Sequence, residues 1–233
     1  MHHAPITFAH RGARDTLPDN TLRAFRRALE LGARGLESDA RCSSDGQVVL
    51  VHGATARRGP LRSRKVARTT AADLADLEVP RLADLYEVLG TDFELSLDVY
   101  DPNAGEHICD VADAAGATDR LWLCSANRTL LERLRRRAPA ANLVHSVRRR
   151  KLDVSPERHA ALLAESGIQV VNMHRTDWTS GLVALYRRFG LQVFAWDVQE
   201  VRHFREVLQL DVDGVYSDHV DRMVAVISEW TAG

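Results

Sequence analysis

The chain has 233 residues, of which 27% are charged, and a formal net charge of -1 at pH 7. This length suits one domain over residues 1–233, with room for a complete (β/α)8 barrel. The near balance of charge gives no general reason to expect nucleic acid as a partner. No stretch approaches the roughly 18 consecutive apolar residues of a membrane span, and the N-terminus lacks the apolar segment of a signal peptide. Because the three cysteines are scattered without metal-type spacing, we expect a protein of the reducing cytoplasm.

Short apolar and β-branched runs alternate with helical stripes along the chain, which is the pattern of an α/β protein. Nine runs are predicted to form strands, one more than a barrel needs. A hairpin-like strand pair near residues 36–52 would absorb the extra strand and leave a (β/α)8 TIM barrel. Helices are expected in most of the intervals, among them residues 71–77 and 82–89. The predicted strands cover residues 6–9, 36–40, 47–51, 93–99, 121–125, 143–147, 170–173, 192–196 and 213–217.

The register of that strand pair depends on its turn, for which residues 43–46 carry the Ser, Asp and Gly signal. A two-residue turn would place Asp39 opposite His52. A four-residue loop would instead place Glu37 opposite His52. Either register predicts that His52 lies beside the two carboxylates.

Polar side chains gather at the ends of the first strands, where barrels hold their chemistry. His10 and Arg11 end the first strand, and His52 ends the third. Glu37 and Asp39 are two residues apart, so in a strand they point to the same face and offer oxygen ligands to one divalent cation. This constellation predicts an active site.

The order and spacing of several segments resemble the glycerophosphodiester phosphodiesterase family over nearly the whole chain. The resemblance implies hydrolysis of a glycerophosphodiester to an alcohol and glycerol 3-phosphate, with His10 and His52 as the acid/base pair. It also implies metal ligation by Glu37, Asp39 and Asp98. The segments are Ala9-His10-Arg11-Gly12, Pro18-Asp19-Asn20-Thr21, Glu37-x-Asp39, Val49-x-Val51-His52, Asp98, Trp196 and Asp213-Gly214-Val215-Tyr216-Ser217-Asp218.

These residue types suit phosphodiester cleavage on chemical grounds as well. A divalent cation neutralises a phosphoryl oxygen, and carboxylate ligands with open positions favour Mg²⁺ or Ca²⁺, with Mn²⁺ as a further candidate. Imidazoles titrate near neutral pH and serve as general acid and base. The guanidinium of Arg11 has the fork geometry that holds a phosphate.

The chain also departs from the family at three positions. Asp98 stands where the family has Glu, Tyr100 where it has Lys, and Gly53 where it has Asp. Two alternatives therefore stay open. One is a lipid phosphodiesterase of the lysophospholipase D or sphingomyelinase D kind, and the other is a barrel that binds phosphate without cleaving it.

The remaining polar features have competing interpretations. Residues 54–70 carry six Arg and Lys side chains and are expected to form an irregular loop, either solvated or acting as a lid that attracts the phosphodiester. Trp196, Tyr100 and Asn172 are candidate pocket residues. Asp218 is expected to cap the last helix rather than to take part in chemistry. The other histidines are treated as surface or packing residues, namely His107, His145, His159, His203 and His219.

Overall fold

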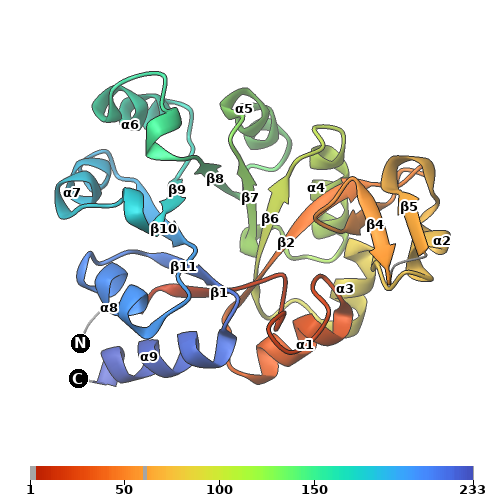
Figure 1. Ribbon diagram of the computed structural model, residues 1–233. Helices are drawn as coiled ribbons and strands as arrows, with labels where there is room; N and C mark the ends of the chain where they lie inside the picture. Colours follow the sequence, from red (N-terminus) through yellow and green to blue (C-terminus); the bar gives the residue numbers. More distant parts are fainter. Residues whose placement is uncertain (1–3, 60–61, 233) are drawn as a thin grey trace.

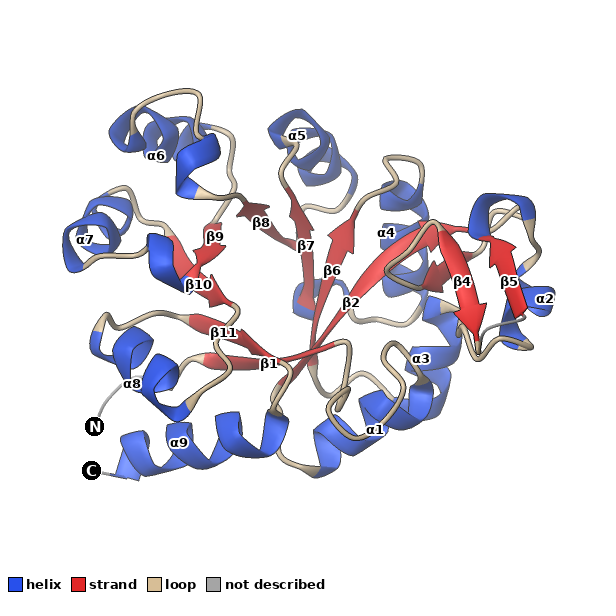
Figure 2. Ribbon diagram, in the orientation of Figure 1, coloured by secondary structure: helices blue, strands red, loops and turns tan. Residues whose placement is uncertain are grey.

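A closed barrel of eight parallel strands forms the centre of the molecule (Figures 1 and 2). The computed structural model describes residues 4–59 and 62–232. The strands run in the order β1-β11-β10-β9-β8-β7-β6-β2, and pairing of β1 with β2 closes the barrel. The TIM-barrel prediction is confirmed. The strands are β1 (Ile6–His10), β2 (Gly35–Cys42), β6 (Glu94–Val99), β7 (Leu121–Ser125), β8 (Asn142–Ser146), β9 (Val170–His174), β10 (Gln192–Trp196) and β11 (Gly214–Ser217).

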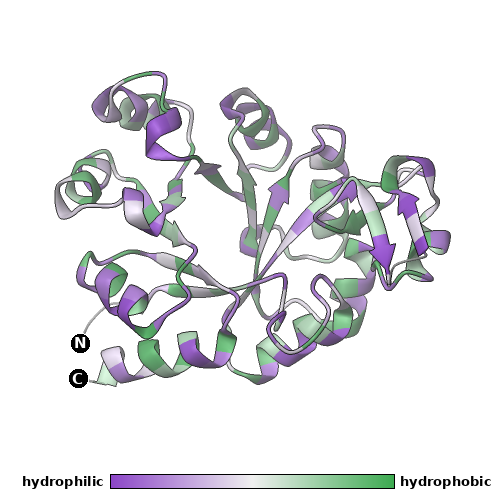
Figure 3. Cartoon of the chain, viewed as in Figure 1, coloured by the Kyte–Doolittle hydropathy of each residue, from purple (hydrophilic) through white to green (hydrophobic). Residues whose placement is uncertain are grey.

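Helices surround the barrel and bury their apolar faces against it, while polar faces point outward (Figure 3). Several begin at a Thr, Asn or Ser whose side chain accepts a backbone N–H of the first turn, as Thr21 does for the first helix. Within the described ranges, no helix is long and apolar enough to cross a membrane. The helices are α1 (Leu22–Glu30), α2 (Ala71–Ala75), α3 (Leu82–Leu89), α4 (Ala104–Ala114), α5 (Arg128–Arg137), α6 (Pro156–Glu165), α7 (Ser180–Arg188), α8 (Val201–Gln209) and α9 (Val220–Ala232).

Aromatic side chains fill the barrel interior and close it below its C-terminal mouth. Phe8 stacks on Tyr216 with ring centroids 4.8 Å apart, and Trp122 packs on Phe194 at 5.3 Å. We call these four side chains the aromatic plug. The neighbouring strands make room for it with glycine, because a Cβ on Gly35 would come within 2.7 Å of the Phe8 ring.

The expected strand pair near residues 36–52 is present, but both predicted registers are wrong. Strand β3 (Val48–Leu50) runs antiparallel to β2, with Ala40 opposite Leu50. Continuing this register places Ser38, and neither carboxylate, across from His52. The turn has three residues between Ser43 and Gln47, and Gly46 takes the left-handed conformation with φ 74°.

The turn is held by the side chain of Ser43, which explains its length. Ser43 Oγ accepts the backbone N–H of Gln47 at 3.0 Å and donates to Asp45 Oδ1 at 2.5 Å. Asp45 in turn accepts the backbone N–H of Ala71 at 3.0 Å. These contacts stabilise a three-residue turn, whereas the two predicted registers assumed turns of two and four residues.

The basic segment 54–70 is not an irregular loop. It forms a two-stranded antiparallel sheet, β4 (Thr55–Arg58) with β5 (Arg62–Lys65), which projects from one side of the barrel (Figure 1). Ala56 and Val66 are buried and join a small apolar cluster with Leu74. These apolar contacts anchor the segment, while the side chains of β5 are exposed.

Candidate active site

A cavity of about 340 Å³ opens above the aromatic plug at the C-terminal mouth of the barrel. Because side chains in a strand alternate between two faces, the residue two positions after an inward-facing one also points inward. His10 follows Phe8 in this way, and Asp218 follows Tyr216. The lining residues placed by this rule, one from each of seven strands or strand ends, are His10, Glu37, Asp98, Ser146, Asn172, Trp196 and Asp218.

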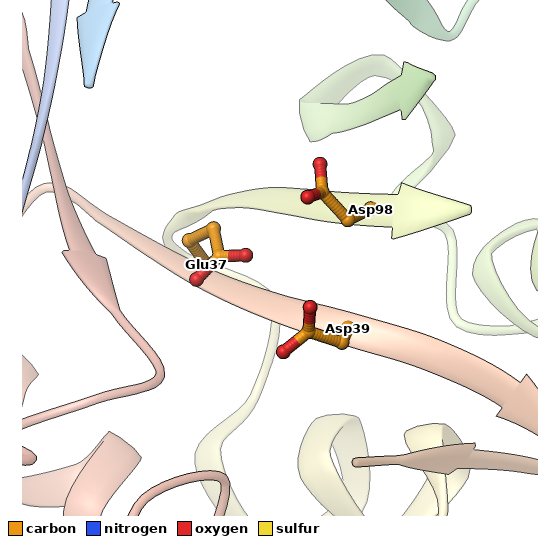
Figure 4. Close-up of side chains that lie close together, drawn as sticks. All are labelled: Glu37, Asp39 and Asp98. Atoms are coloured by element: carbon orange, nitrogen blue, oxygen red, sulfur yellow. The ribbon is translucent and has the colours of Figure 1, made fainter. Parts of the chain in front are cut away.

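Three carboxylates converge at one edge of this cavity (Figure 4). Glu37 and Asp39 lie on β2, and Asp98 lies opposite Asp39 on the neighbouring strand β6. Oxygen atoms of all three lie within 4.8 Å of one another, close enough for a single cation to contact each. The three candidate metal ligands are thus brought together.

Arg11 and Asn20 support the cluster from the β1 side. Arg11 takes a left-handed backbone with φ 59°, donates its N–H to Glu37 Oε2 at 3.1 Å, and forms an ion pair with Asp39 through Nε at 3.1 Å. Asn20 donates to Asp39 Oδ2 at 3.4 Å and accepts from Ser38 Oγ at 2.7 Å. Arg11 also lines the cavity.

The electrostatics of the cluster favour a bound cation. Burial, and then the charges of Asp39 and Asp98, raise the pKa of Glu37 well above its ordinary value. Burial and the charge of Asp39 raise the pKa of Asp98 to about 7. Three carboxylates face one guanidinium, so negative charge is in excess and a divalent cation would relieve it.

His10 lies beside the cluster and is oriented by a carboxylate from the last strand. Its Nδ1 is 2.5 Å from Asp218 Oδ1, and its Nε2 is 3.8 Å from Glu37 Oε2. Burial alone would raise the pKa of Asp218, but the hydrogen bond and charge of His10, together with the charge of Arg14, hold it below its ordinary value. Asp218 is therefore ionised and fixes the imidazole with Nδ1–H directed toward it.

Asp218 was missed as a site residue, because its position before a helix suggested a cap. Its side chain instead lines the cavity and accepts from His10. Gln199 holds it in place, since Gln199 Oε1 accepts the Asp218 backbone N–H at 2.9 Å. The signal that could have found it is its spacing of two residues from Tyr216 in an inward-facing strand pattern.

His52 lies at the rim and does not line the cavity that holds His10. Its ring meets the ring of Tyr100 edge-on with centroids 6.3 Å apart. Tyr100 donates its hydroxyl to Asp98 Oδ2 at 3.1 Å, so His52 contacts the carboxylate cluster through Tyr100. Burial and the charge of Asp98 raise the pKa of the Tyr100 phenol, which keeps it a donor.

The three candidate pocket residues, Trp196, Tyr100 and Asn172, all line the cavity. His174, which ends a strand and was a further candidate for the mouth, pairs with Asp197 beside Trp196. His174 Nε2 is 2.9 Å from Asp197 Oδ2, and the His174 ring contacts Trp196 edge-on at 4.6 Å. Asp197 adds a carboxylate to the side of the cavity opposite β2 and β6.

A second group of histidines lies outside the cavity, between β8, α6 and α7. His145 Nε2 is 3.1 Å from the carbonyl of Ala126, His159 Nε2 is 3.0 Å from His145 Nδ1, and His159 Nδ1 is 2.7 Å from the Tyr186 hydroxyl. Both imidazoles are buried. The chain of donors and acceptors is complete when both are neutral, as expected for packing residues.

Comparison with known proteins identifies the family of the chain. The model of the glycerophosphoryl diester phosphodiesterase family matches residues 10–222, which include every residue of the carboxylate cluster and both His10 and His52. The chain belongs to this family. The predicted enzyme class, a phosphoric diester hydrolase, is confirmed at the level of the family.

Relatives of this family match the chain over almost its full length. A glycerophosphodiester phosphodiesterase of Caldanaerobacter subterraneus is 24% identical over 243 residues, which span 95% of this chain and 97% of the relative. The structure of a glycerophosphodiester phosphodiesterase from Thermotoga maritima superposes with a TM-score of 0.85 at 22% identity, covering 97% of this chain and all of that one.

A phosphodiesterase from Oleispira antarctica, solved in complex with the product sn-glycerol-3-phosphate, has a TM-score of 0.81 at 20% identity and covers 97% of each chain. These structures share the barrel fold.

Proposed function

We propose that this chain hydrolyses glycerophosphodiesters to an alcohol and glycerol 3-phosphate, using a divalent cation and the two histidines His10 and His52. The observation that carries the proposal is the position of His10, which is held by Asp218 at 2.5 Å and lies next to three converging carboxylates. The product-bound relative from Oleispira antarctica supports the choice of substrate.

Glu37, Asp39 and Asp98 are the residues that would hold the metal. Their excess of negative charge and all-oxygen donor set fit Mg²⁺, Ca²⁺ or Mn²⁺. When bound, such an ion neutralises developing charge on a phosphoryl oxygen, which lowers the barrier by several kcal/mol. Arg11, which lines the cavity beside these ligands, would bind the phosphate.

His10 and His52 would exchange protons with the substrate from two sides of the carboxylate cluster. With Nδ1–H bound to Asp218, His10 presents Nε2 to the reacting groups. His52 is exposed at the rim beside Tyr100, where it would reach the group that enters or leaves through the mouth. One histidine would remove a proton from the nucleophile and the other would protonate the leaving alkoxide.

The proposal is tested by glycerol 3-phosphate release from a panel of glycerophosphodiesters with Mg²⁺, Mn²⁺ or Ca²⁺, and then with a chelator. We expect chelator-sensitive release, reduced by about 10²- to 10⁴-fold in His10→Ala and in His52→Ala. His107→Ala is the matched control, because His107 is an exposed histidine on α4 and does not line the cavity. Release that persists at the normal rate in His10→Ala would reject the acid/base assignment.

The same assay with an intact lysolipid separates the alternative substrates. Lysolipid turnover without any action on glycerophosphodiesters would replace the proposed function with a lipid phosphodiesterase. Metal-dependent binding of glycerol 3-phosphate without turnover of either class would indicate a barrel that binds phosphate and does not cleave it.

A further inference from the structure

A second hollow of about 490 Å³ adjoins the active-site cavity over β6, β7 and β8. The two share four lining residues, Asp98, Tyr100, Ser146 and Trp196, so a molecule bound at the carboxylate cluster can extend from one into the other. A phosphodiester has two substituents on phosphorus. The second hollow is placed to receive one of them.

The two spaces differ in the charge of their walls. Glu37, Asp197 and Asp218 line the active-site cavity and do not line the second hollow. The second hollow is lined by the cations Arg148 and Lys151, and its lining carboxylate, in the part of the chain that the structure describes, is the metal-ligand candidate Asp98. Its walls therefore favour negative charge.

Arg148 is fixed in a position that blocks an organic cation. Its guanidinium makes a two-pronged ion pair with Asp177, at 2.6 and 3.1 Å, and lies over the Trp196 ring at 5.6 Å from the centroid. A quaternary or primary ammonium group binds to a protein through the face of such an aromatic ring. Here the guanidinium of Arg148 already covers a face of that ring, so an organic cation cannot stack on the same face.

Lys151 supplies charge that is free to act on a ligand. Its side chain is exposed, and within residues 4–59 and 62–232 it has no carboxylate partner at ion-pair distance, whereas Arg148 is largely neutralised by Asp177. Asn127 adds a polar group to the same wall, where its carboxamide oxygen caps α5 and leaves the amide N–H groups as donors.

We propose that the second hollow holds the alcohol-side substituent of the substrate and selects head groups that carry an anionic group, with Lys151 as the specificity-determining residue. This inference rests on the proposed phosphodiesterase function and adds to it the chemical class of the alcohol. Choline and ethanolamine, which carry only a positive charge, are disfavoured by Arg148 and Lys151.

Glycerophosphoserine and glycerophosphoethanolamine test the inference as a matched pair, because they differ by one carboxylate. With the wild-type chain we expect kcat/KM for the serine ester to exceed that for the ethanolamine ester by about tenfold or more, a difference that corresponds to one favourable charge interaction. In Lys151→Glu the ratio of kcat/KM for the serine ester to that for the ethanolamine ester should decrease at least fivefold, mainly through KM. The ratio in Lys151→Gln should lie between those of the wild-type chain and Lys151→Glu.

Arg150→Glu is the matched control. Arg150 is the exposed neighbour of Lys151 and does not line the hollow, so it makes the same change in net charge without facing the substrate. An equal loss of selectivity in Arg150→Glu and Lys151→Glu would overturn the role of Lys151, because it would show a general effect of charge.

The outcomes separate this inference from the proposed function. Chelator-sensitive hydrolysis of both esters with a ratio near one, or with ethanolamine preferred, would overturn the inference and leave the phosphodiesterase function intact. Absence of turnover of every glycerophosphodiester would overturn both.

Discussion

Charge is concentrated in two regions of the molecule, the carboxylate cluster and the β4–β5 hairpin, and the two are built differently. The carboxylates of Glu37, Asp39 and Asp98 lie on barrel strands, with Glu37 and Asp39 less than 5% exposed, and each has defined partners. The cations of the β4–β5 hairpin are exposed, and its one ion pair among the described residues joins Arg58 to Glu78 at 3.6 Å.

This difference separates two uses of charge. Buried groups with fixed partners set distances at the reacting atoms, because strand geometry holds them to a fraction of an ångström. Exposed cations at flexible side-chain ends are screened by water and salt, and act over longer range on the approach of an anion. Substitutions should therefore have large effects in the first region and small effects in the second.

The largest effect is expected from Glu37→Gln, which removes one metal-ligand candidate from the buried cluster. Metal affinity should fall by at least about 100-fold, since the loss of even an outer partner of a metal ligand costs 10- to 100-fold. Isothermal titration calorimetry with Mg²⁺ or Mn²⁺ measures the change. Arg64→Gln in the hairpin serves as the control and should bind metal as the parent chain does. If Glu37→Gln also binds metal with the affinity of the parent chain, the role of Glu37 as a ligand is contradicted.

Asp218→Asn should lower kcat by about 100-fold, as a general acid or base that is wrongly oriented loses most of its contribution. The amide can donate to His10 Nδ1 and so favours the tautomer that carries its proton on Nε2, which then cannot accept a proton from the reacting group. Metal affinity should stay the same, which distinguishes a positioning role from damage to the cluster. Asp221→Asn, an exposed acidic residue at the start of α9, is the control.

The buried histidine pair gives a pH dependence of stability with a defined sign. Burial first, and then the charge of His145, lower the pKa of His159 to about 4. An imidazole in the unfolded chain has a pKa near 6.5, so the unfolded state binds protons more readily between about pH 6.5 and 4. The stability that the protein gains from keeping His159 neutral is therefore complete above about pH 6.5 and is lost as the pH falls toward 4.

As the pH falls through that interval, we expect the protonation of His159 to lower the free energy of unfolding by roughly 2 to 3 kcal/mol. Urea denaturation at pH 7.5 and at pH 4.5 measures it, and His159→Phe should show a smaller pH dependence than the parent chain. His107→Phe on the exposed side of α4 should keep the parent's dependence. An equal change in the free energy of unfolding between pH 7.5 and pH 4.5 in all three proteins would refute the contribution of His159.

The smallest effect is expected from Arg62→Ala combined with Arg64→Ala on β5. The free energy of unfolding should change by less than about 0.5 kcal/mol, because both side chains are exposed. At 0.15 M salt, kcat/KM should change only a few-fold, since the Debye length is about 8 Å. A loss comparable to that of the Asp218 variant would mean that the hairpin acts as a lid on the substrate.

The fold could be predicted because each barrel strand is a short apolar run that ends in polar residues. The same reasoning placed Glu37 and Asp39 on one face of a strand, and the resemblance to the family added Asp98. The register of the 36–52 hairpin could not be obtained, because it depends on how Ser43 bonds Gln47 and Asp45 across the turn. Such side-chain bonds are decided by tertiary contacts, here with Ala71.

Asp218 was missed for a related reason. A Ser-Asp pair ahead of a helix matches a cap in sequence, and local pattern alone does not show that the strand before it ends at the barrel mouth. The pairing of residues 55–58 with residues 62–65 was missed because the few apolar residues of this segment lie among many cations in the sequence. Ala56 and Val66 become informative only when Leu74 is known to lie against them.

The aromatic plug determines the route by which ligands enter and leave the cavity. The plug closes the barrel beneath the carboxylate cluster. Ligands must therefore enter and leave the cavity through the same C-terminal mouth. In the proposed reaction the phosphorylated product and the released alcohol would leave by the route on which the next substrate arrives. Glycerol 3-phosphate should accordingly compete with substrate, and its departure can govern the turnover of the loaded enzyme.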